Sequence, residues 1–513
     1  MRSSANPAKA PRFPWLVVLA TAILAARLLF TLHLPNLWID EQIVVDATTA
    51  PNAQSALTQA LESERRPPLF NLLMWGWRQW AGEGEWQTRL LPALFAVLFV
   101  PAVYALTRRL FGPRAAGFAV LLCAIHPLLL SYGQIIRYYT LVAALAALSN
   151  AAFLNVLRGR ATRRDWIVHF IATSGLLLSD YPAYAVLLAQ NLLVGVALLR
   201  RSRFPLRGWA VSHAVWLVVC VPIAATALLQ SARDFGVAEL STGLLGHVLK
   251  IAYAGFAWSI GEYLFPWRVA ALLGLAASVA LLATGLFSRR APAGRAPVWM
   301  AVTMLAVPLA VSLVLLATVA RDSPFVNSAA RTMSAFAPFI AICAYGAARL
   351  PVRAAALLAV ALLVAQVQSG IQHDLRLDTL NPIYTTPARE AAQFIARHAQ
   401  PGDLVVTESD SLVERYLPPD VRARHFDVSQ AAEVLSILDR TPDAGVWFVQ
   451  LGRDRTRNDA TAALITKSSE LRTLVETTGL AEQDPVYRQV KERLLNRAAY
   501  AYRLTITQLG PRP

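Results

Sequence analysis

The chain has 513 residues, of which 56% are hydrophobic, and a formal net charge of +16 at pH 7. Apolar runs of about 20 residues recur along it, the length that crosses a bilayer as a helix, so we exclude a soluble enzyme and predict a polytopic membrane protein. The basic residues fall largely in short links between these runs rather than in one patch, which argues against nucleic acid as a partner.

The first apolar run covers residues 15–34 and follows three basic residues, Arg2, Lys9 and Arg12. The run is too long for the apolar core of a typical signal peptide, contains Arg27 and lacks a convincing cleavage site, so we predict a retained first helix. Because a charge inside an apolar span is costly, we expect Arg27 to face the interior of a helix bundle rather than lipid.

Two adjacent carboxylates, Asp40 and Glu41, follow the first run after an interfacial aromatic residue, Trp38. One interpretation of this pair is a solvated loop start, since charge is easily accommodated at a helix end. The other is a general base at the mouth of a membrane cavity, which would take a proton from a hydroxyl. We assign no metal ligand, although a divalent cation (Mg²⁺ or Mn²⁺) could bind at these carboxylates.

The remaining apolar runs predict about eleven membrane crossings in total. A polar loop at 35–87 follows the first run, and within it 57–64 and 68–80 are expected to be helices lying in the membrane interface. A second long loop is predicted at 230–266. The further crossings are predicted at 88–107, 115–131, 138–157, 166–179, 183–199, 209–229, 267–287, 298–320, 333–348 and 352–369.

The distribution of arginine predicts the orientation of these crossings. Alternate links between the crossings are rich in arginine, and the remaining links contain few basic residues. By the positive-inside rule the rich links and the N-terminus are cytoplasmic. With an odd number of crossings, both long loops and the tail then lie on the opposite face. The rich links are 108–114, 158–164, 200–207, 289–295 and 349–353.

The composition changes near residue 372, so we predict a transmembrane domain at 1–371 and a small α/β domain at 372–513. The tail contains no Gly-rich phosphate loop and no metal-spaced His or Cys set. We therefore expect a structural cap or a module that docks the acceptor. Its predicted elements are helices at 389–398 and 431–438 and strands at 404–407, 446–450 and 504–507.

Short polar clusters interrupt the apolar sequence on the predicted outer face, and arginine and tyrosine are prominent in them. A guanidinium group binds phosphate through two hydrogen bonds and neutralises the charge that builds as a glycosidic bond breaks. A transferase with a lipid-phosphate donor is therefore one interpretation, and anchoring to lipid headgroups is the alternative for each arginine. The clusters are Asp40 with Glu41, 64–70, 132–139, 180–184, and 327–331 with Pro338 beyond it.

The order of these features resembles a known family. The first span, the Asp-Glu pair, a Pro-Pro-Leu loop helix at 67–69 and the segment RLLPALFAVLFVPAVYALTRRLFG at 89–112 follow one another. This series is similar to the GT-C membrane glycosyltransferases, especially the protein O-mannosyltransferase and lipid A aminoarabinose transferase branch. The resemblance runs to about residue 199 and returns at 331–338. It implies an α-helical polytopic fold in a bacterial inner membrane, with a C-terminal periplasmic α/β domain.

The resemblance also implies roles for particular residues. A catalytic Asp of the first outer loop maps to Asp40, with Glu41 beside it to position the acceptor or share a proton. The donor would be a polyprenyl-phosphate sugar. Its phosphate would be bound by Arg66, Arg137, Tyr139 and Arg331, which match arginine and tyrosine positions of the family. Ile135 stands where the family has a Glu.

The predicted activity is inverting transfer of the sugar to a hydroxyl of a cell-envelope glycan or lipid on the periplasmic face. A protein Ser or Thr acceptor is the alternative within the enzyme class. A lipid or glycan transporter or flippase predicts inverted repeats and several mid-span charges, and only Arg27 fits the latter. A purely structural scaffold leaves the outward clustering of Asp40, Arg66 and Arg137 unexplained.

Overall fold

The chain forms two compact units, each of which is described by itself. The helical unit comprises Met1–His33 and Val44–Leu375, and the α/β unit comprises Leu34–Ile43 and Arg376–Pro513. The computed structural model describes residues 14–62, 66–202, 204–231, 244–287, 295–318, 328–375, 380, 386–407, 412–422, 425–427, 431–451, 455–469, 472–480 and 504–511.

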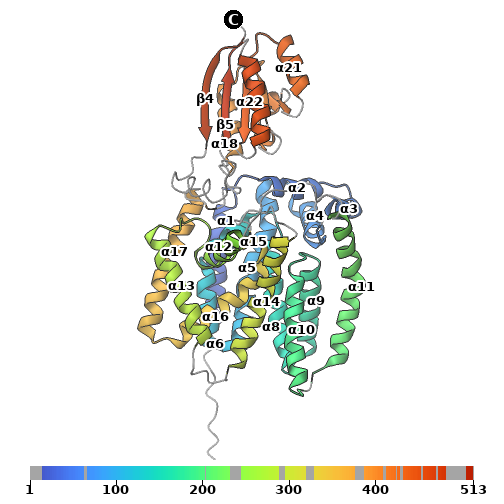
Figure 1. Cartoon of the computed structure of the whole chain (residues 1–513), viewed down its shortest axis with the longest axis vertical. Coiled ribbons are helices and arrows are strands. Elements are labelled where there is room, and N and C mark those ends of the chain that lie inside the picture. Colours follow the sequence, from blue (N-terminus) through green and yellow to red (C-terminus); the bar gives the residue numbers. More distant parts are fainter. Residues whose placement is uncertain are drawn as a thin grey trace, which may run out of the picture. The chain divides into compact units, whose positions relative to one another are not determined.

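Helices make up the helical unit (Figure 1). A further helix, α2 (Ile39–Ala47), begins in the α/β unit and ends in the helical unit. The elements are α1 (Pro14–Thr31), α3 (Ala53–Glu62), α4 (Leu69–Ala81), α5 (Glu85–Phe111), α6 (Pro113–Ala124), α7 (Pro127–Gln134), α8 (Tyr139–Leu157), α9 (Arg163–Leu177), α10 (Tyr184–Leu199), α11 (Leu206–Ser231), α12 (Leu244–Ile260), α13 (Val269–Phe287), α14 (Ala296–Thr318), α15 (Ser328–Arg331), η2 (Met333–Ala335), α16 (Phe336–Arg349) and α17 (Val352–Leu375).

The predicted multi-pass membrane class is confirmed. Among the described residues, seven helices are long and apolar enough to cross a membrane, or eight if the bent pair α6 and α7 counts as one span. Three shorter apolar helices accompany them. About eleven crossings were expected because apolar runs of 14 to 17 residues, such as 183–199, are hard to distinguish from full spans by sequence. The seven are α1, α5, α8, α11, α13, α14 and α17.

Two expectations are corrected. The expected single crossing at 115–131 is two helices, α6 and α7, that meet at 56°. Pro127 begins α7, and the His126 imidazole caps it by accepting from the backbone N–H of Leu128 at 3.2 Å, so one helix ends and another starts here. The expected loop at 230–266 contains the apolar helix α12. Residues 232–243 of that loop, and 288–294 of the basic link at 289–295, lie outside the described residues.

Helix α8 is the most enclosed of the candidate spans, with 83% of its most apolar window buried. Alanines dominate its sequence, and small side chains let neighbouring helices approach closely. Polar side chains then connect it to two neighbours. Ser149 of α8 hydrogen bonds to Thr173 of α9 at 2.8 Å and accepts from Gln190 of α10 at 2.9 Å. The core of the helical unit is thus assembled around α8.

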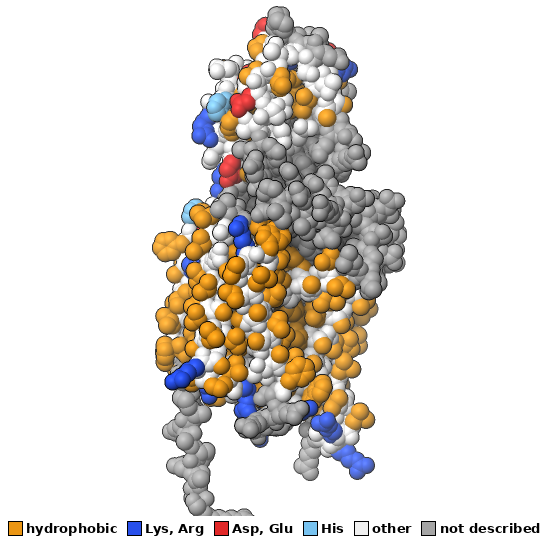
Figure 2. Space-filling model, turned by 60° about the vertical axis from the view of Figure 1, so that its left-hand side comes forward, with side chains coloured by type: hydrophobic (Ala, Val, Ile, Leu, Met, Phe, Trp, Pro, Cys, Tyr) orange, Lys and Arg blue, Asp and Glu red, His pale blue; other side chains and the backbone are white. Residues whose placement is uncertain are grey.

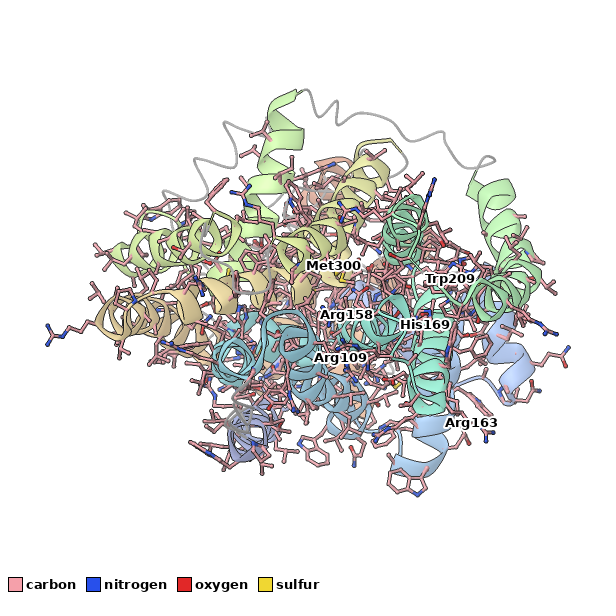
Figure 3. All side chains as sticks on the ribbon, turned by 90° about the horizontal axis from the view of Figure 1, so that it is seen from below. Arg109, Arg158, Arg163, His169, Trp209 and Met300 are labelled. Atoms are coloured by element: carbon pink, nitrogen blue, oxygen red, sulfur yellow. The ribbon has the colours of Figure 1, made fainter. Side chains whose placement is uncertain are left out.

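The outer faces of the long helices are apolar, as expected for helices in contact with lipid. Val218 is 75% exposed and Leu357 71% exposed, and Figure 2 shows hydrophobic side chains over the face of the helical unit with Lys and Arg at its lower end. Figure 3 looks at that end, where Arg158 donates to the backbone carbonyl of Arg109 at 2.6 Å. Two of the predicted arginine-rich links therefore meet at one end of the bundle.

The α/β unit contains a five-stranded sheet in the order β2-β1-β3-β5-β4. Strand β1 pairs in parallel with β2 and β3, whereas β5 pairs antiparallel with β3 and β4. Leu404, Val406, Val446, Phe448, Leu464 and Leu509 form its buried core. The elements are α18 (Ala388–His398), β1 (Leu404–Thr407), α19 (Val413–Tyr416), α20 (Pro419–Arg422), β2 (His425–Asp427), α21 (Ala431–Arg440), β3 (Val446–Leu451), α22 (Arg455–Ser469), β4 (Leu474–Leu480) and β5 (Leu504–Leu509).

The predicted α/β character is confirmed, and all five predicted elements of the tail are present as α18, β1, α21, β3 and β5. The remaining elements were not predicted. Strand β2 has three residues, and β4, with the sequence LVETTGL, lacks a clear apolar alternation.

Candidate functional site

The segment 132–139, predicted to lie at a boundary between spans, is completely buried inside the helical unit. Its Gln134 side chain donates to the Thr31 hydroxyl of α1 at 2.5 Å, and Arg89 of α5 donates to the backbone carbonyl of Gln134. Arg89 is itself fully buried. Two helices therefore fix the turn that leads from α7 into α8, and with it the position of Tyr138.

The Tyr138 hydroxyl joins two arginines that are far apart in the sequence. Arg66 and Arg331 each donate an Nη1–H to this oxygen, Arg331 at 2.5 Å. The Asp180 carboxylate interacts electrostatically with both arginines and with Tyr138. Since a hydroxyl has two acceptor lone pairs, the two arginines can occupy both of them.

Backbone contacts of neighbouring elements bring these residues together. The N–H of Leu69, at the start of α4, donates to the carbonyl of Leu178 at 2.9 Å, and this places Arg66 close to Asp180. On the other side, the Ser328 hydroxyl of α15 donates to the backbone carbonyl of Lys250 in α12 at 2.8 Å. This contact fixes the short helix that ends at Arg331.

Arg137 and Tyr139 complete the group, which we call the Tyr138 cluster: Arg66, Arg137, Tyr138, Tyr139, Asp180 and Arg331. The Arg137 guanidinium carbon lies 5.8 Å from the centre of the Tyr138 ring, and that of Arg66 lies 5.1 Å from it, so both are in cation–π range. The rings of Tyr138 and Tyr139 are 5.1 Å apart.

Positive charge exceeds negative charge in the Tyr138 cluster, which has three arginines and one carboxylate. Burial raises the pKa of Tyr138 to about 12, although Arg331 and Arg66 act in the opposite direction, so the phenol stays neutral. Burial also raises the pKa of Asp180, against the effect of Arg331 and Arg66. Three guanidinium groups and one carboxyl group leave a net positive charge, and the cluster therefore favours a bound anion.

Asp40 and Glu41 belong to the α/β unit and lie in the first turn of α2. Glu41 is 1% exposed, and its carboxylate accepts from the backbone N–H of Trp38 at 3.2 Å, which is half of a capping box. Asp40 is half-buried. Glu41 thus has a structural contact within its own turn, and Asp40 is the more exposed member of the pair.

The structure gathers Arg66, Arg137, Tyr139 and Arg331 in one place, as their assignment to a single ligand requires. Sequence reasoning did not single out Tyr138 or Asp180, although both lay in polar clusters on the predicted outer face. Among the described residues no group of three His, Cys, Asp or Glu side chains could hold a metal ion. A divalent cation at Asp40 and Glu41 remains a prediction.

The chain is similar to a known protein family and to solved structures. Residues 65–226 match the family model described as dolichyl-phosphate-mannose-protein mannosyltransferase, and this range contains every member of the Tyr138 cluster except Arg331. The structure of ArnT from Cupriavidus metallidurans in the apo state superposes with a TM-score of 0.55. That match covers 96% of this chain and 97% of ArnT at 15% identity. The chain has the fold of the GT-C glycosyltransferases.

Two further solved structures are similar to the chain. ArnT from Cupriavidus metallidurans bound to undecaprenyl phosphate matches with a TM-score of 0.52 at 16% identity, over 96% of this chain and 97% of that chain. The Archaeoglobus fulgidus oligosaccharyltransferase matches with a TM-score of 0.48 at 13% identity, over 89% of this chain and 72% of that chain. No curated protein sequence matches the chain. The resemblance to GT-C enzymes and the glycosyltransferase class are confirmed, since the matched family model is that of a glycosyltransferase and the chain shares the fold of ArnT.

Proposed function

We propose that this GT-C protein transfers a sugar from a polyprenyl phosphate to a hydroxyl of a cell-envelope glycan or lipid. The observation that carries the proposal is the convergence of Arg66 and Arg331 on the buried Tyr138 hydroxyl, with Arg137 beside its ring. A phosphate group can replace the hydroxyl as acceptor for both guanidinium groups and supply the missing negative charge. The undecaprenyl phosphate bound by ArnT is a lipid phosphate of this kind.

In the proposed reaction Asp40 removes the proton from the acceptor hydroxyl, and the oxygen attacks the anomeric carbon. The bond from that carbon to the phosphate oxygen breaks, and its electron pair leaves with polyprenyl phosphate. Attack opposite the leaving group inverts the anomeric centre. Arg66, Arg137 and Arg331 stabilise the charge that grows on the phosphate, which is where preorganised donors accelerate a reaction most.

We further propose that the reaction takes place on the periplasmic face of a bacterial inner membrane. The arginine-rich links at one end of the bundle support a cytoplasmic location for that end and for the N-terminus. A periplasmic site has no nucleotide sugars, which favours a lipid-carried donor. A protein Ser or Thr is the alternative acceptor.

Lipid binding tests the proposed phosphate site. The purified protein should bind undecaprenyl phosphate at least about tenfold more tightly than undecaprenol, because charge-assisted contacts to phosphate are worth more than about 1.4 kcal/mol. Arg331→Met should remove this preference, and Arg331→Lys should restore only part of it. Arg353→Met, on the exposed face of α17, is the matched control. Equal binding of the two lipids by the unmodified protein would refute the phosphate site.

A further inference from the structure

The segment that contains Asp40 clusters with the α/β unit rather than with the helical unit. We infer that the α/β unit positions this catalytic residue: helices α18 and α19 hold residues 36–42, here called the Asp40 segment, in one conformation. The inference rests on the proposed role of Asp40 as the base. It gives the C-terminal unit a part in the reaction that goes beyond a structural cap.

The contacts of the Asp40 segment begin at Asn36, which is 3% exposed. Its side-chain amide donates to the backbone carbonyl of Thr386 at 2.9 Å and to the Glu390 carboxylate at 2.6 Å. Thr386 precedes α18 and Glu390 lies in its first turn. One amide group thus attaches the start of the Asp40 segment to α18.

Helix α19 holds the segment on both sides of Asp40. The backbone N–H of Leu37 donates to the Tyr416 hydroxyl at 3.0 Å, and Arg415 donates to the Gln42 side-chain carbonyl at 2.9 Å. The Arg389 guanidinium of α18 lies 5.2 Å from the centre of the Tyr416 ring. The cation–π contact links the two helices, so the anchors act as one group.

The segment itself is folded so that Asp40 is more exposed than Glu41. Leu37 is fully buried and Trp38 is 5% exposed. The Glu41 carboxylate is buried and accepts from the backbone N–H of Trp38, whereas Asp40 is half-buried. Helix α19 follows Leu412, which has a φ of 56° in the left-handed region that residues other than glycine rarely adopt. Such conformations persist where surrounding structure requires them, which indicates that the direction of α19 is fixed by tertiary contacts.

Positioning of this kind matters for a general base. The base must lie within hydrogen-bond reach of the hydroxyl that it deprotonates, and a displacement of about 1 Å can reduce the rate about 100-fold. The anchors lie 350 to 379 residues from the segment in sequence, so local sequence cannot supply them. Asn36, Arg415 and Tyr416 are therefore positioning residues, since they act through the segment and touch no reacting atom.

The first test measures the segment directly and needs no activity. A Leu37→Cys substitution places a buried thiol in the segment and keeps the backbone N–H that binds Tyr416; the three native cysteines are buried. Maleimide labelling of this thiol in the full-length protein should accelerate about fivefold or more when Tyr416→Phe is added. Loss of one hydrogen bond raises the population of the open segment by about this factor. Arg397→Met, an exposed α18 side chain bonded to its own helix, is the control. An unchanged labelling rate with Tyr416→Phe and with Arg415→Met would overturn the inference.

The second test uses transfer from the polyprenyl-phosphate sugar fraction extracted from membranes of a strain that lacks this protein. Tyr416→Phe with Arg415→Met should lower kcat about 10- to 100-fold and leave the KM for the donor unchanged. In an Asp40→Asn background the same pair should cause no further loss, because the base it positions is absent. An equal loss in both backgrounds would show that the pair acts elsewhere and contradict the inference. An active Asp40→Asn protein would instead contradict the proposed function, and the labelling test would still decide whether the segment is anchored.

Discussion

At the scale of single residues, the structure depends most on the Tyr138 hydroxyl. Tyr138→Phe leaves the ring in place but removes the oxygen that accepts from Arg66 and Arg331. Because hydrogen bonds to charged groups are strong and these groups are buried, we expect the free energy of unfolding to fall by about 3 kcal/mol. Thermal unfolding of the purified protein measures the loss. Tyr104→Phe, in α5, is the control, and an equal effect of both substitutions would contradict the assignment.

Glu262, which follows α12, should make stability depend on pH. It is 2% exposed and accepts from the Tyr253 hydroxyl at 2.6 Å; burial raises its pKa to about 7, although Tyr253 and Tyr132 act in the opposite direction. A carboxyl whose pKa rises on folding binds its proton more tightly in the folded state. The stabilisation that protonated Glu262 gives the folded state is therefore complete below the ordinary pKa near 4.5. It is lost as pH rises through about 7.

The measurement is the unfolding temperature between pH 5 and pH 8. The unmodified protein should lose stability with a slope of up to about 1.4 kcal/mol per pH unit from this group, and Glu262→Gln should flatten the curve. Glu62→Gln changes an exposed carboxyl and should leave the curve as it is. A curve for Glu262→Gln that is parallel to that of the unmodified protein would show that Glu262 does not titrate in this range.

Arg66, Arg137 and Arg331 were selected because guanidinium groups on the predicted outer face suggest phosphate and because the family resemblance points to these three positions. The parts played by Tyr138 and Asp180 could not be predicted. The bond from Arg331 to Tyr138 spans 193 residues, and a carboxylate or phenol gains its role only from such partners. The capping contact of Glu41 could have been recognised, since a Glu at the third position of a helix is a local signal.

At the scale of elements, the contact between α13 and α16 depends on glycine. A Cβ at Gly346 would lie 2.0 Å from the backbone carbonyl oxygen of Leu281, and a Cβ at Gly285 would lie 2.3 Å from that of Ile342. Gly346→Ala should therefore separate the helices and cost about 1–3 kcal/mol of unfolding free energy. Gly195→Ala in α10 meets nothing within 4 Å and should be neutral or stabilising by up to about 1 kcal/mol. The measurement is the unfolding temperature of each variant. Equal unfolding temperatures for Gly346→Ala and Gly195→Ala would contradict the close packing of α13 and α16.

Helices of 18 residues or more were predictable because an apolar run of that length can cross a bilayer, where a helix satisfies all of its backbone hydrogen bonds. The break at His126 and Pro127 was not predicted, although proline at the start of α7 is its local cause. Helix α12 was missed because its flanks, at 230–243 and 261–266, suggest a continuous polar loop. In the α/β unit the strands with β-branched runs, such as β3, were found and the three-residue β2 was not.

At the scale of the whole molecule, the orientation in the membrane is testable by labelling. We expect Asp420→Cys, in the α/β unit, to react with a membrane-impermeant maleimide added to spheroplasts. Arg160→Cys, in the link between α8 and α9, should react only after the membrane is opened. Both positions are exposed and the native cysteines are buried, so reactivity reports sidedness. Reaction of Arg160→Cys in sealed spheroplasts would reverse the proposed orientation.

Mass analysis of cell-envelope glycans tests the central claim most directly, because it detects the transferred sugar by its mass whatever its identity. In a deletion strain one envelope glycan or lipid should lack the mass of a single sugar, and the unmodified protein should restore it. Asp40→Asn keeps the size of the side chain but cannot accept the proton, so transfer should fall by about two to four orders of magnitude at matched protein levels. Envelopes that are identical with and without the protein would contradict glycosyl transfer to envelope glycans and lipids, and full restoration by Asp40→Asn would contradict Asp40 as its base.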